Sequence, residues 1–270
     1  MSNSDSFTFI EGELPLLISV PHDGRKLPPD MSSRMTQEGL YLPDTDWHIN
    51  ELYAFTRQMD VSLISADYSR YVVDLNRSAD DSALYENQRS TGLCPKKTFA
   101  GKSIYSSLES INSQEINQRV ISFWNPYHEK IRKILQGMKT RYGYALLWDA
   151  HSIKTFVPNL FEGRLPDLNI GTNSGESCPQ IIENAILNIA LNSTYSVVTN
   201  ERFKGGYITR NYGNPMDQIY AIQLEIAQSC YMNETSLTYD TKLAKKLTIT
   251  LERMLAVSYT HLTLPTKRIV

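Results

Sequence analysis

Short apolar runs of strand length alternate along the chain with longer stretches in which apolar residues recur at helical spacing. The predicted strands cover residues 16–20, 61–65, 71–75, 144–148, 196–199 and 221–226. The predicted helices cover residues 47–59, 113–140, 179–191 and 242–255. Such alternation is typical of proteins in which helices cover a central sheet. The sequence therefore predicts an α/β fold.

The second predicted helix, residues 113–140, contains a proline. Apolar residues recur at helical spacing from Ile116 to Leu135 and define one buried face. Pro126 lies inside this pattern, and it lacks the N–H that a helix interior needs. We therefore expect a kink at Pro126, or two helices in place of one.

The pattern indicates a single domain over residues 1–257, because a chain of 270 residues buries enough surface for one large core. Residues 78–110 follow neither period and are predicted to form an ordered loop, of the kind that is often functional. Residues 258–270 continue no periodicity of the last predicted helix. We interpret them as a non-native tail and exclude His261 from the site.

Composition narrows the class of protein. The formal net charge is −2 with acids and bases interspersed, which argues against a nucleic-acid-binding face or a polybasic membrane segment. No apolar stretch approaches the roughly 20 residues that cross a bilayer, and the N-terminus lacks a signal-peptide pattern. Three separated cysteines fit reduced thiols. We expect a cytoplasmic protein that acts on a small molecule, and the sequence leaves its oligomeric state open, a homo-oligomer included.

Polar residues suited to a hydrolytic site follow or occupy four of the predicted strands. His22 follows LLISV, Asn76 and Arg77 follow YVVDL, His151 follows YALLW, and Glu225 lies within AIQLEIA. Ligands of open α/β sheets bind in the crevice at the carboxyl ends of the strands, where residues distant in sequence meet. We therefore expect these side chains to converge.

Two of these side chains are histidines, the residue type that binds Zn²⁺ most readily as a neutral imidazole. A catalytic zinc takes three protein ligands and keeps one open position. His22 and His151 are two candidates, although a turn and a packed core also explain them. Asp46 in DTDWH is the preferred third ligand, His48 is the alternative, and a helix cap at Asp44 explains the same acidic cluster without a metal.

Glu225 alternates with apolar neighbours in a buried strand, where a carboxylate is costly unless it is paired or used. Its predicted use is as the general base that takes a proton from the attacking water, and a structural ion pair is the alternative. Asp149, two residues before His151, is a candidate for orienting that imidazole.

Arginines surround the same predicted strand ends. Guanidinium groups bind carboxylates through two hydrogen bonds, so several of them around one pocket indicate a substrate with more than one carboxylate. The candidate substrate-binding residues are Arg70, Asn76, Arg77 and Arg210, and a structural role remains open for each arginine. The predicted partner is therefore a small dicarboxylate.

Several segments taken together resemble one known family. They are SVPHDGR, DTDWHINELY, SRYVVDLNR, LYENQRSTGLCP, WDAHSIKT, FEGRLPDLNIGTN, RFKGGYITRNYG and AIQLEIAQ. In number, order and spacing, from about residue 15 to about residue 232, they are similar to the N-formylglutamate amidohydrolases of histidine degradation. The resemblance implies hydrolysis of N-formyl-L-glutamate to formate and glutamate, one zinc ion, and a mixed sheet between helices, as in zinc carboxypeptidases.

The resemblance also implies an order of roles along the chain: histidine, acid, Asn-Arg, histidine and glutamate base. This sequence departs from the pattern twice. Arg25 stands where the acid of an HxxE motif would follow His22, and Tyr220 stands where many relatives carry histidine. Two further hypotheses are a zinc amidase for another N-acyl acidic amino acid and a non-catalytic binder of acidic metabolites. A serine hydrolase is disfavoured, because GxSxG is absent.

Overall fold

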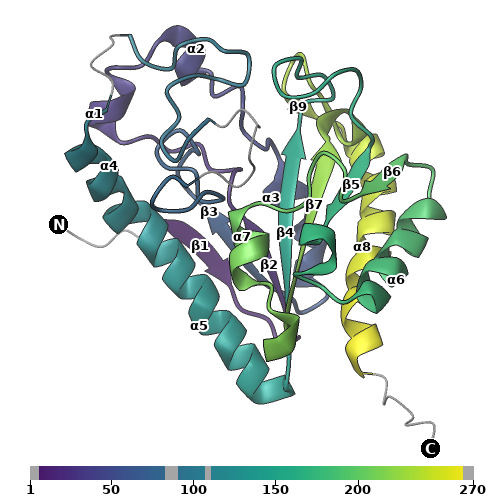
Figure 1. Cartoon of the computed structure of the whole chain (residues 1–270). Coiled ribbons are helices and arrows are strands. Elements are labelled where there is room, and N and C mark those ends of the chain that lie inside the picture. The colour runs from purple at the N-terminus through teal and green to yellow at the C-terminus, as the bar shows by residue number, and fades with distance from the viewer. Residues whose placement is uncertain (1–5, 83–90, 107–110, 264–270) are drawn as a thin grey trace, which may run out of the picture.

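A mixed β-sheet forms the centre of the computed structural model, which describes residues 6–82, 91–106 and 111–263. In this part of the chain seven strands lie in the order β1-β3-β2-β4-β7-β5-β6 (Figure 1). Their bounds are β1 Phe7–Ile10, β2 Leu16–Val20, β3 Ser62–Ala66, β4 Ala145–Ile153, β5 Leu168–Gly171, β6 Val197–Thr199 and β7 Ile219–Ala227. Strands β3, β2, β4 and β7 run parallel, whereas β1 and β5 run antiparallel to β3 and β7. The predicted mixed sheet is confirmed.

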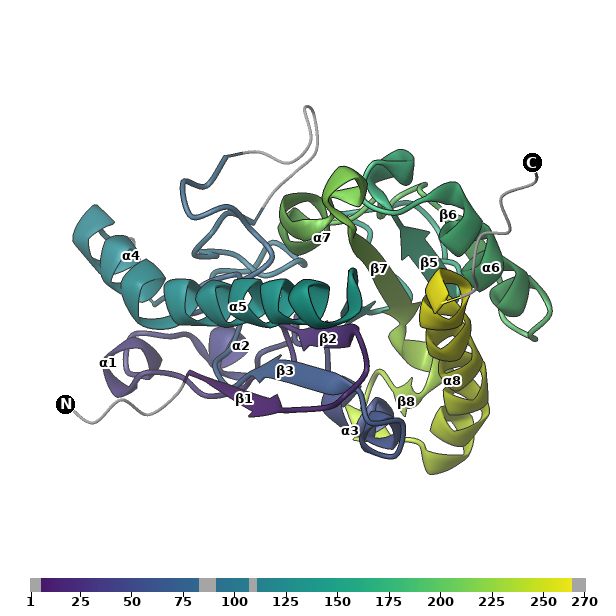
Figure 2. The ribbon, with the colours of Figure 1, turned by 90° about the horizontal axis from the view of Figure 1, so that it is seen from below.

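Helices cover both faces of this sheet (Figure 2). Helix α5 packs against β2 and β4 and α7 against β7, whereas α6 and α8 pack on the opposite face. The helices are α1 Pro29–Ser32, α2 Gln37–Leu40, α3 Ile49–Leu52, α4 Ser113–Arg119, α5 Asn125–Tyr142, α6 Gln180–Leu191, α7 Tyr207–Tyr212 and α8 Thr241–Thr263. A short hairpin, β8 Met232–Asn233 and β9 Thr238–Tyr239, precedes α8. The molecule is an α/β fold, as predicted.

Successive side chains of β4 point to opposite faces of the sheet, and each face contacts its own hydrophobic core. Leu147 joins the cluster under α5, whereas Leu146 and Trp148 join the cluster under α6 and α8. By the same period of two, Asp149 and His151 point to the α5 side, the side on which the polar residues gather.

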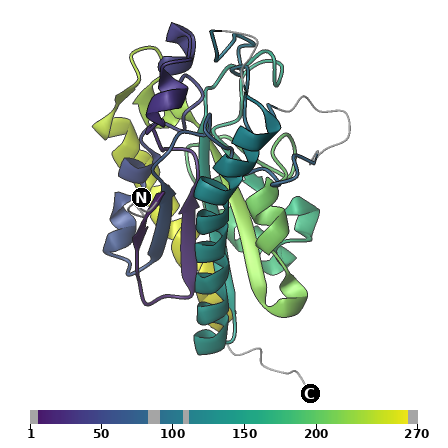
Figure 3. The same ribbon diagram turned by 90° about the vertical axis from the view of Figure 1, so that its left-hand side faces the viewer.

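The predicted helix 113–140 is divided, as its proline required. Helix α4 is followed by a π-helical turn, Val120–Trp124, and α5 begins at Asn125 with Pro126 in its first turn. Proline supplies no N–H to the helical ladder, and prolines and π turns are both places where helices kink. Figure 3 shows α5 lying along the strands after this turn.

Two sequence-based elements were wrong. Residues 71–75 form turns in place of a strand, because Arg119 Nη1 on α4 donates to the Val72 carbonyl and Asp74 N–H donates to the Leu93 carbonyl. Residues 47–59 hold only the short α3 and a 3₁₀ turn, Ala54–Arg57. Strands β1 and β5 were missed, since both are short.

The C-terminal helix runs further than the predicted residue 255. Helix α8 continues to Thr263, and Ser258 is fully buried on the face that also carries Leu247 and Leu251. The helical period therefore extends past residue 257, contrary to our expectation. The domain boundary there stays a prediction, and residues 264–270 lie outside the described residues. Residues 83–90 and 107–110 of the predicted loop also lie outside the described residues. The described parts of that loop, residues 78–82 and 91–106, contain no helix or strand.

The direction of chain progression reverses between β2 and β4. From β2 the chain proceeds to β3 on one side, and it returns later to place β4 on the other side of β2. Loops from adjacent parallel strands therefore diverge at this point and leave a crevice at their carboxyl ends. His22 follows β2 and His151 lies near the end of β4, so both histidines are at this edge.

Candidate metal centre and active site

His22, Asp46 and His151 meet at the carboxyl edge of the sheet. One ligand atom from each lies within 4.8 Å of the other two, and all three residues are buried. Asp46 Oδ2 is 3.1 Å from His151 Nδ1 and 3.7 Å from His22 Nδ1. The structure thus brings together the three candidate ligands, from segments that lie far apart in the sequence.

A second carboxylate lies at the outer nitrogen of each imidazole. Asp74 Oδ1 accepts a hydrogen bond from His22 Nε2 over 2.8 Å, and Asp149 Oδ2 is 3.0 Å from His151 Nε2. A proton held on Nε2 of His22 leaves Nδ1 of that ring able to bind a cation. Sequence reasoning proposed Asp149 for this position and missed Asp74. A carboxylate within the apolar run Tyr-Val-Val-Asp-Leu was the available signal.

The donor set fits a divalent metal ion. Within the described residues His22 Nδ1 is buried and has no hydrogen-bond partner, an arrangement that is costly unless a ligand binds there. Two imidazoles and one carboxylate are the ligand types of catalytic zinc sites. Burial opposes ionisation of Asp46, yet the neighbouring His151 and His22 imidazoles hold the pKa of Asp46 below its ordinary value. The site is therefore an anionic, buried cluster that suits a cation.

Other residues weighed as ligands or caps point elsewhere. His48 lies in the left-handed backbone region, and its Nε2 is 2.9 Å from the Leu237 carbonyl. Asp44 accepts hydrogen bonds from the Tyr71 hydroxyl and the Phe99 N–H. Arg25, at the fourth position of His-x-x-Glu, lies half-exposed over the Trp47 ring. The structure therefore favours Asp46 over His48 at the metal centre.

Glu225 lies beside this centre on the neighbouring strand. In the parallel pairing of β4 and β7, Glu225 is the register partner of His151. Leu224 and Ile226 join the core under α6 and α8, so Glu225 faces the opposite side, as the alternation predicted. Burial raises the pKa of Glu225 to about 8, and the charge of Asp46 acts in the same direction. A carboxylate with a raised pKa beside a metal site is suited to carrying a proton.

Arg70 contacts two of the carboxylates around the candidate metal site. Its Nη2 donates to Asp74 Oδ2 over 2.6 Å, and its Nη1 is 3.6 Å from Asp46 Oδ1. The guanidinium also packs on the Phe99 ring at 4.9 Å. Burial opposes this charge, but the surrounding carboxylates, Asp74 first, hold the pKa of Arg70 above its ordinary value. The structure thus pairs Arg70 with the acids that surround the candidate ligands.

Asn76 connects the metal centre to the start of α7. Its Nδ2 lies 3.0 Å from His151 Nε2, and its Oδ1 accepts a hydrogen bond from the Ile208 N–H. Gly206 packs so closely that a Cβ there would lie 2.3 Å from Asn76 Nδ2. Glycine is therefore required at 206 by a close approach. Arg210 follows one turn later, with its Nε donating to the Gly205 carbonyl.

Trp124 of the π-helical turn and His128 of α5 hold the backbone on either side of Asn76. Trp124 Nε1 donates to the Arg77 carbonyl, and His128 Nε2 donates to the Leu75 carbonyl, each over 2.9 Å. The two rings stack at 3.8 Å. Burial lowers the pKa of His128 to about 3, so its ring is neutral. The structure therefore gives His128 a packing role.

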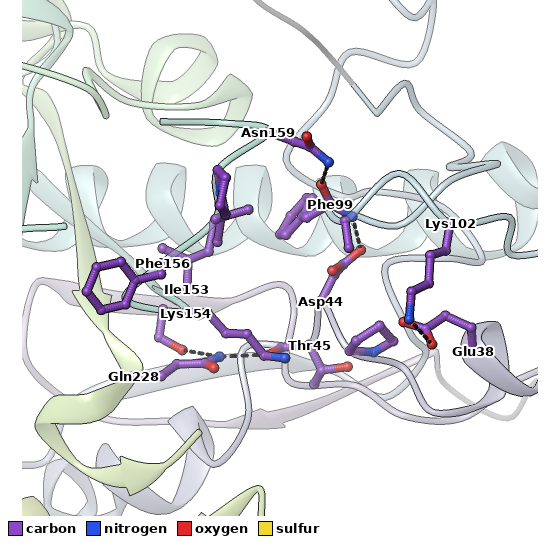
Figure 4. Close-up of a pocket in the computed structure, with 15 residues that line it drawn as sticks. Glu38, Asp44, Thr45, Phe99, Lys102, Ile153, Lys154, Phe156, Asn159 and Gln228 are labelled. Carbon is purple, nitrogen blue, oxygen red and sulfur yellow. Dashed lines mark hydrogen bonds and ion pairs between the residues drawn. The ribbon is translucent and has the colours of Figure 1, made fainter. Parts of the chain in front are cut away.

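A cavity of about 470 Å³ adjoins the peptide segments that carry two of the candidate ligands. Thr45 and Ser152, the chain neighbours of Asp46 and His151, line it together with Lys154, Phe99 and Gln228. Figure 4 shows Gln228 bonded to the Thr45 carbonyl and Asp44 bonded to the Phe99 N–H across this space. The Ser152 N–H in turn donates to Asp46 Oδ2 over 3.1 Å. The cavity therefore shares a wall with the metal centre.

Comparison with known proteins agrees with this geometry. The family model described as N-formylglutamate amidohydrolase matches residues 14–232. The chain belongs to the N-formylglutamate amidohydrolase family. It is 44% identical over 250 residues to the N-formylglutamate deformylase of Pseudomonas putida, covering 92% of this chain and 93% of that protein. It is 47% identical over 228 residues to the deformylase of Pseudomonas aeruginosa, covering 84% of this chain and 85% of the relative.

Solved structures support the fold. The crystal structure of N-formylglutamate amidohydrolase from Ralstonia eutropha JMP134 superposes with a TM-score of 0.83 at 21% identity, over 96% of this chain and 99% of that one. The gene product Atu2144 from Agrobacterium tumefaciens has a TM-score of 0.72 at 16% identity, over 94% and 96% of the two chains. The family match and the two Pseudomonas deformylases identify this member of the N-formylglutamate amidohydrolase family as an amidohydrolase. Among its described helices, none combines the length and apolarity needed to cross a bilayer.

Proposed function

We propose that the protein hydrolyses N-formyl-L-glutamate to formate and L-glutamate with one zinc ion, as the last step of a histidine degradation route in the cytoplasm. Its relatives from Pseudomonas putida and Pseudomonas aeruginosa are N-formylglutamate deformylases, and both are more than 40% identical to it over most of the chain. The observation that supports the metal is the buried grouping of His22, Asp46 and His151.

These three residues would hold the zinc ion. Asp74 holds the outer nitrogen of the His22 ring, which directs its Nδ1 toward Asp46, and Asp149 lies 3.0 Å from His151 Nε2. When bound, zinc supplies a Lewis acid that polarises a carbonyl oxygen and lowers the pKa of a coordinated water. Burial of the ligands keeps bulk water from competing for the ion and strengthens these electrostatic effects.

Glu225 would carry the proton. Hydrolysis adds water to the formyl carbon, breaks the bond between that carbon and the amide nitrogen, and requires one proton to pass from the water to the leaving amine. Glu225 accepts this proton and then donates it to the nitrogen, and a pKa near neutrality permits both steps. Its position next to His151 across the β4 and β7 pair supports this role.

The substrate carboxylates would bind on the α7 side of the metal centre. Asn76, Arg77 and Arg210 lie on the two segments joined there by the bond from the Ile208 N–H to Asn76 Oδ1. We assign both substrate carboxylates to this region, because guanidinium groups bind carboxylates in a bidentate manner. Arg70 is the fourth proposed substrate-binding residue. Its guanidinium group, held by Asp74, adds positive charge next to Asp46.

Formate release is the experiment that tests this function. The purified protein is assayed with N-formyl-L-glutamate, then with a chelator present, and then after zinc is restored. We expect turnover that the chelator abolishes and zinc recovers. N-acetyl-L-glutamate serves as the matched substrate, and faster turnover of the acetyl compound would refute the formyl specificity. Glutamate binding without formate release, with zinc present, would refute the enzyme.

A further inference from the structure

Gln223 is a buried amide on the same face of β7 as Glu225. It lies two residues earlier in the strand and is 4% exposed. Its register partners are Asp149 on β4 and Gly171 on β5. Gln223 and Asp149 thus lie side by side, two residues before the pair formed by Glu225 and His151. A buried amide is costly unless its donors and acceptor are used.

Both ends of this amide are used, and by different parts of the active site. Gln223 Oε1 accepts the Gly206 N–H over 2.7 Å, and Gln223 Nε2 donates to Glu225 Oε2 over 3.4 Å. The backbone donor fixes which end of the amide is the oxygen, so the Nε2 end must face the carboxylate. One side chain therefore contacts both the proposed base and the backbone that precedes α7.

The backbone at Gly205 and Gly206 is held on its other sides as well. The Gly205 carbonyl accepts a hydrogen bond from Arg210 Nε, and Gly206 packs against Asn76 at a distance that admits no Cβ. Gly205 itself has a φ of +114°, a conformation that other residues rarely adopt. A shift of this dipeptide would therefore move Asn76 and Arg210 together.

We propose that Gln223 is a positioning residue that couples Glu225 to the substrate-binding segment at residues 205–210. It holds Gly206 through Oε1, which sets the position of Arg210, and it orients the Glu225 carboxylate through Nε2. The inference deepens the proposed function, since it relies on Glu225 as base and Arg210 as carboxylate ligand. It predicts that one substitution impairs both proton transfer and substrate binding.

Gln223→Met removes both hydrogen bonds while nearly preserving side-chain volume. Tyr220→Phe is the matched control. Tyr220 lies on the same strand as Gln223, and its substitution deletes a hydrogen bond from the Tyr220 hydroxyl to Gln218. Its side chain faces the core on the opposite side of the sheet. Zinc content and the unfolding midpoint are measured for both, and we expect both variants to retain the metal. Gln223→Met should lower kcat about tenfold and raise KM about tenfold, as expected for lost buried hydrogen bonds. Wild-type kcat and KM in this variant would overturn the proposal.

Double substitution separates positioning from a general loss of stability. Glutamate affinity is measured by calorimetry for Gln223→Met, Arg210→Ala and the pair. If Gln223 acts through Arg210, its removal should weaken affinity about tenfold in the wild type and less than about threefold in Arg210→Ala. If the two substitutions weaken glutamate affinity by factors that multiply in the pair, the coupling is overturned.

If Gln223→Met does not fold, Gln223→Glu replaces it, because the glutamate keeps the acceptor for Gly206. An unchanged kcat in Gln223→Glu would also contradict the proposal.

A readout without substrate distinguishes this inference from the proposed function. Amide hydrogen exchange at Gly206 is followed in the free, zinc-loaded protein, because its N–H donates to Gln223. We expect exchange to accelerate about tenfold or more in Gln223→Met and to stay unchanged in Tyr220→Phe. If the wild type releases no formate, the proposed function fails, and this exchange rate still decides the role of Gln223. Unchanged exchange would refute it.

Discussion

Asp74 accepts a hydrogen bond from His22 Nε2 over 2.8 Å, and the opposite nitrogen of the same ring faces Asp46 at 3.7 Å. A positive Arg70 beside Asp74 and the bond to His22 outweigh burial and hold the pKa of Asp74 well below its ordinary value. The carboxylate therefore stays ionised, keeps the proton of His22 on Nε2, and leaves Nδ1 available to a metal ion.

Asp74→Asn should weaken zinc binding about 10- to 100-fold, because the amide no longer fixes the His22 tautomer. Zinc affinity is measured by competition with a chromogenic chelator. Asp44→Asn is the matched control: Asp44 is also a buried acid, but it bonds to Tyr71 and Phe99. Equal zinc affinity in Asp74→Asn and the wild type would remove Asp74 from the site.

Glu225→Gln should keep one zinc ion per chain and lose about 10²- to 10⁴-fold in kcat, since the amide cannot carry a proton. Metal content by elemental analysis and formate release are measured on the same sample. A kcat within tenfold of the wild type would show that another group transfers the proton.

Arg77→Ala should raise KM about 10- to 100-fold with little change in zinc content, because a charge-assisted bond to a substrate carboxylate is lost. Arg77→Lys keeps the charge but not the two-point contact, so its KM should lie between those of Arg77→Ala and the wild type. An unchanged KM in Arg77→Ala would contradict a substrate-binding role.

Trp124→Phe should raise KM several-fold, because the Arg77 carbonyl loses its donor and the backbone beside Asn76 loosens. Trp148→Phe is the matched control, since Trp148 Nε1 donates to the Tyr53 hydroxyl in the opposite core. We expect Trp148→Phe to lower the unfolding free energy by about 1 kcal/mol or more and leave KM unchanged. Similar KM values in both variants would mean that Trp124 is only a packing residue.

His128 should make the fold sensitive to acid. Burial lowers its pKa from 6.5 to about 3, so below pH 6.5 the unfolded chain binds a proton that the folded chain does not. Its contribution to stability is therefore complete above pH 6.5 and is lost as the pH falls toward 3, with a slope of at most about 1.4 kcal/mol per pH unit. Urea unfolding of the wild type and His128→Gln from pH 7 to pH 4 tests this, and the variant should show the shallower slope. Parallel slopes would refute the assignment.

The sequence by itself predicted the α/β class and the strands that carry the site. Residues 16–20 are almost wholly apolar and residues 221–226 alternate apolar and polar positions, and β2 and β7 contain these two runs. Convergence of His22, His151 and Glu225 follows from that prediction, because parallel strands end at one edge of a sheet. The local pattern was sufficient to place these side chains, because the period of two along a strand decides which face of the sheet a residue occupies.

Tertiary contacts decided the rest. The run at 71–75 is as apolar as a strand, but Arg119 from α4 satisfies its carbonyls and it turns. The sequence preferred Asp46 to His48 as the third ligand without excluding His48, and the left-handed backbone at His48 and its contact with Leu237 come only from the fold. Partners so distant along the chain are invisible to a local pattern, because a hydrogen bond depends on where the folded backbone places both atoms.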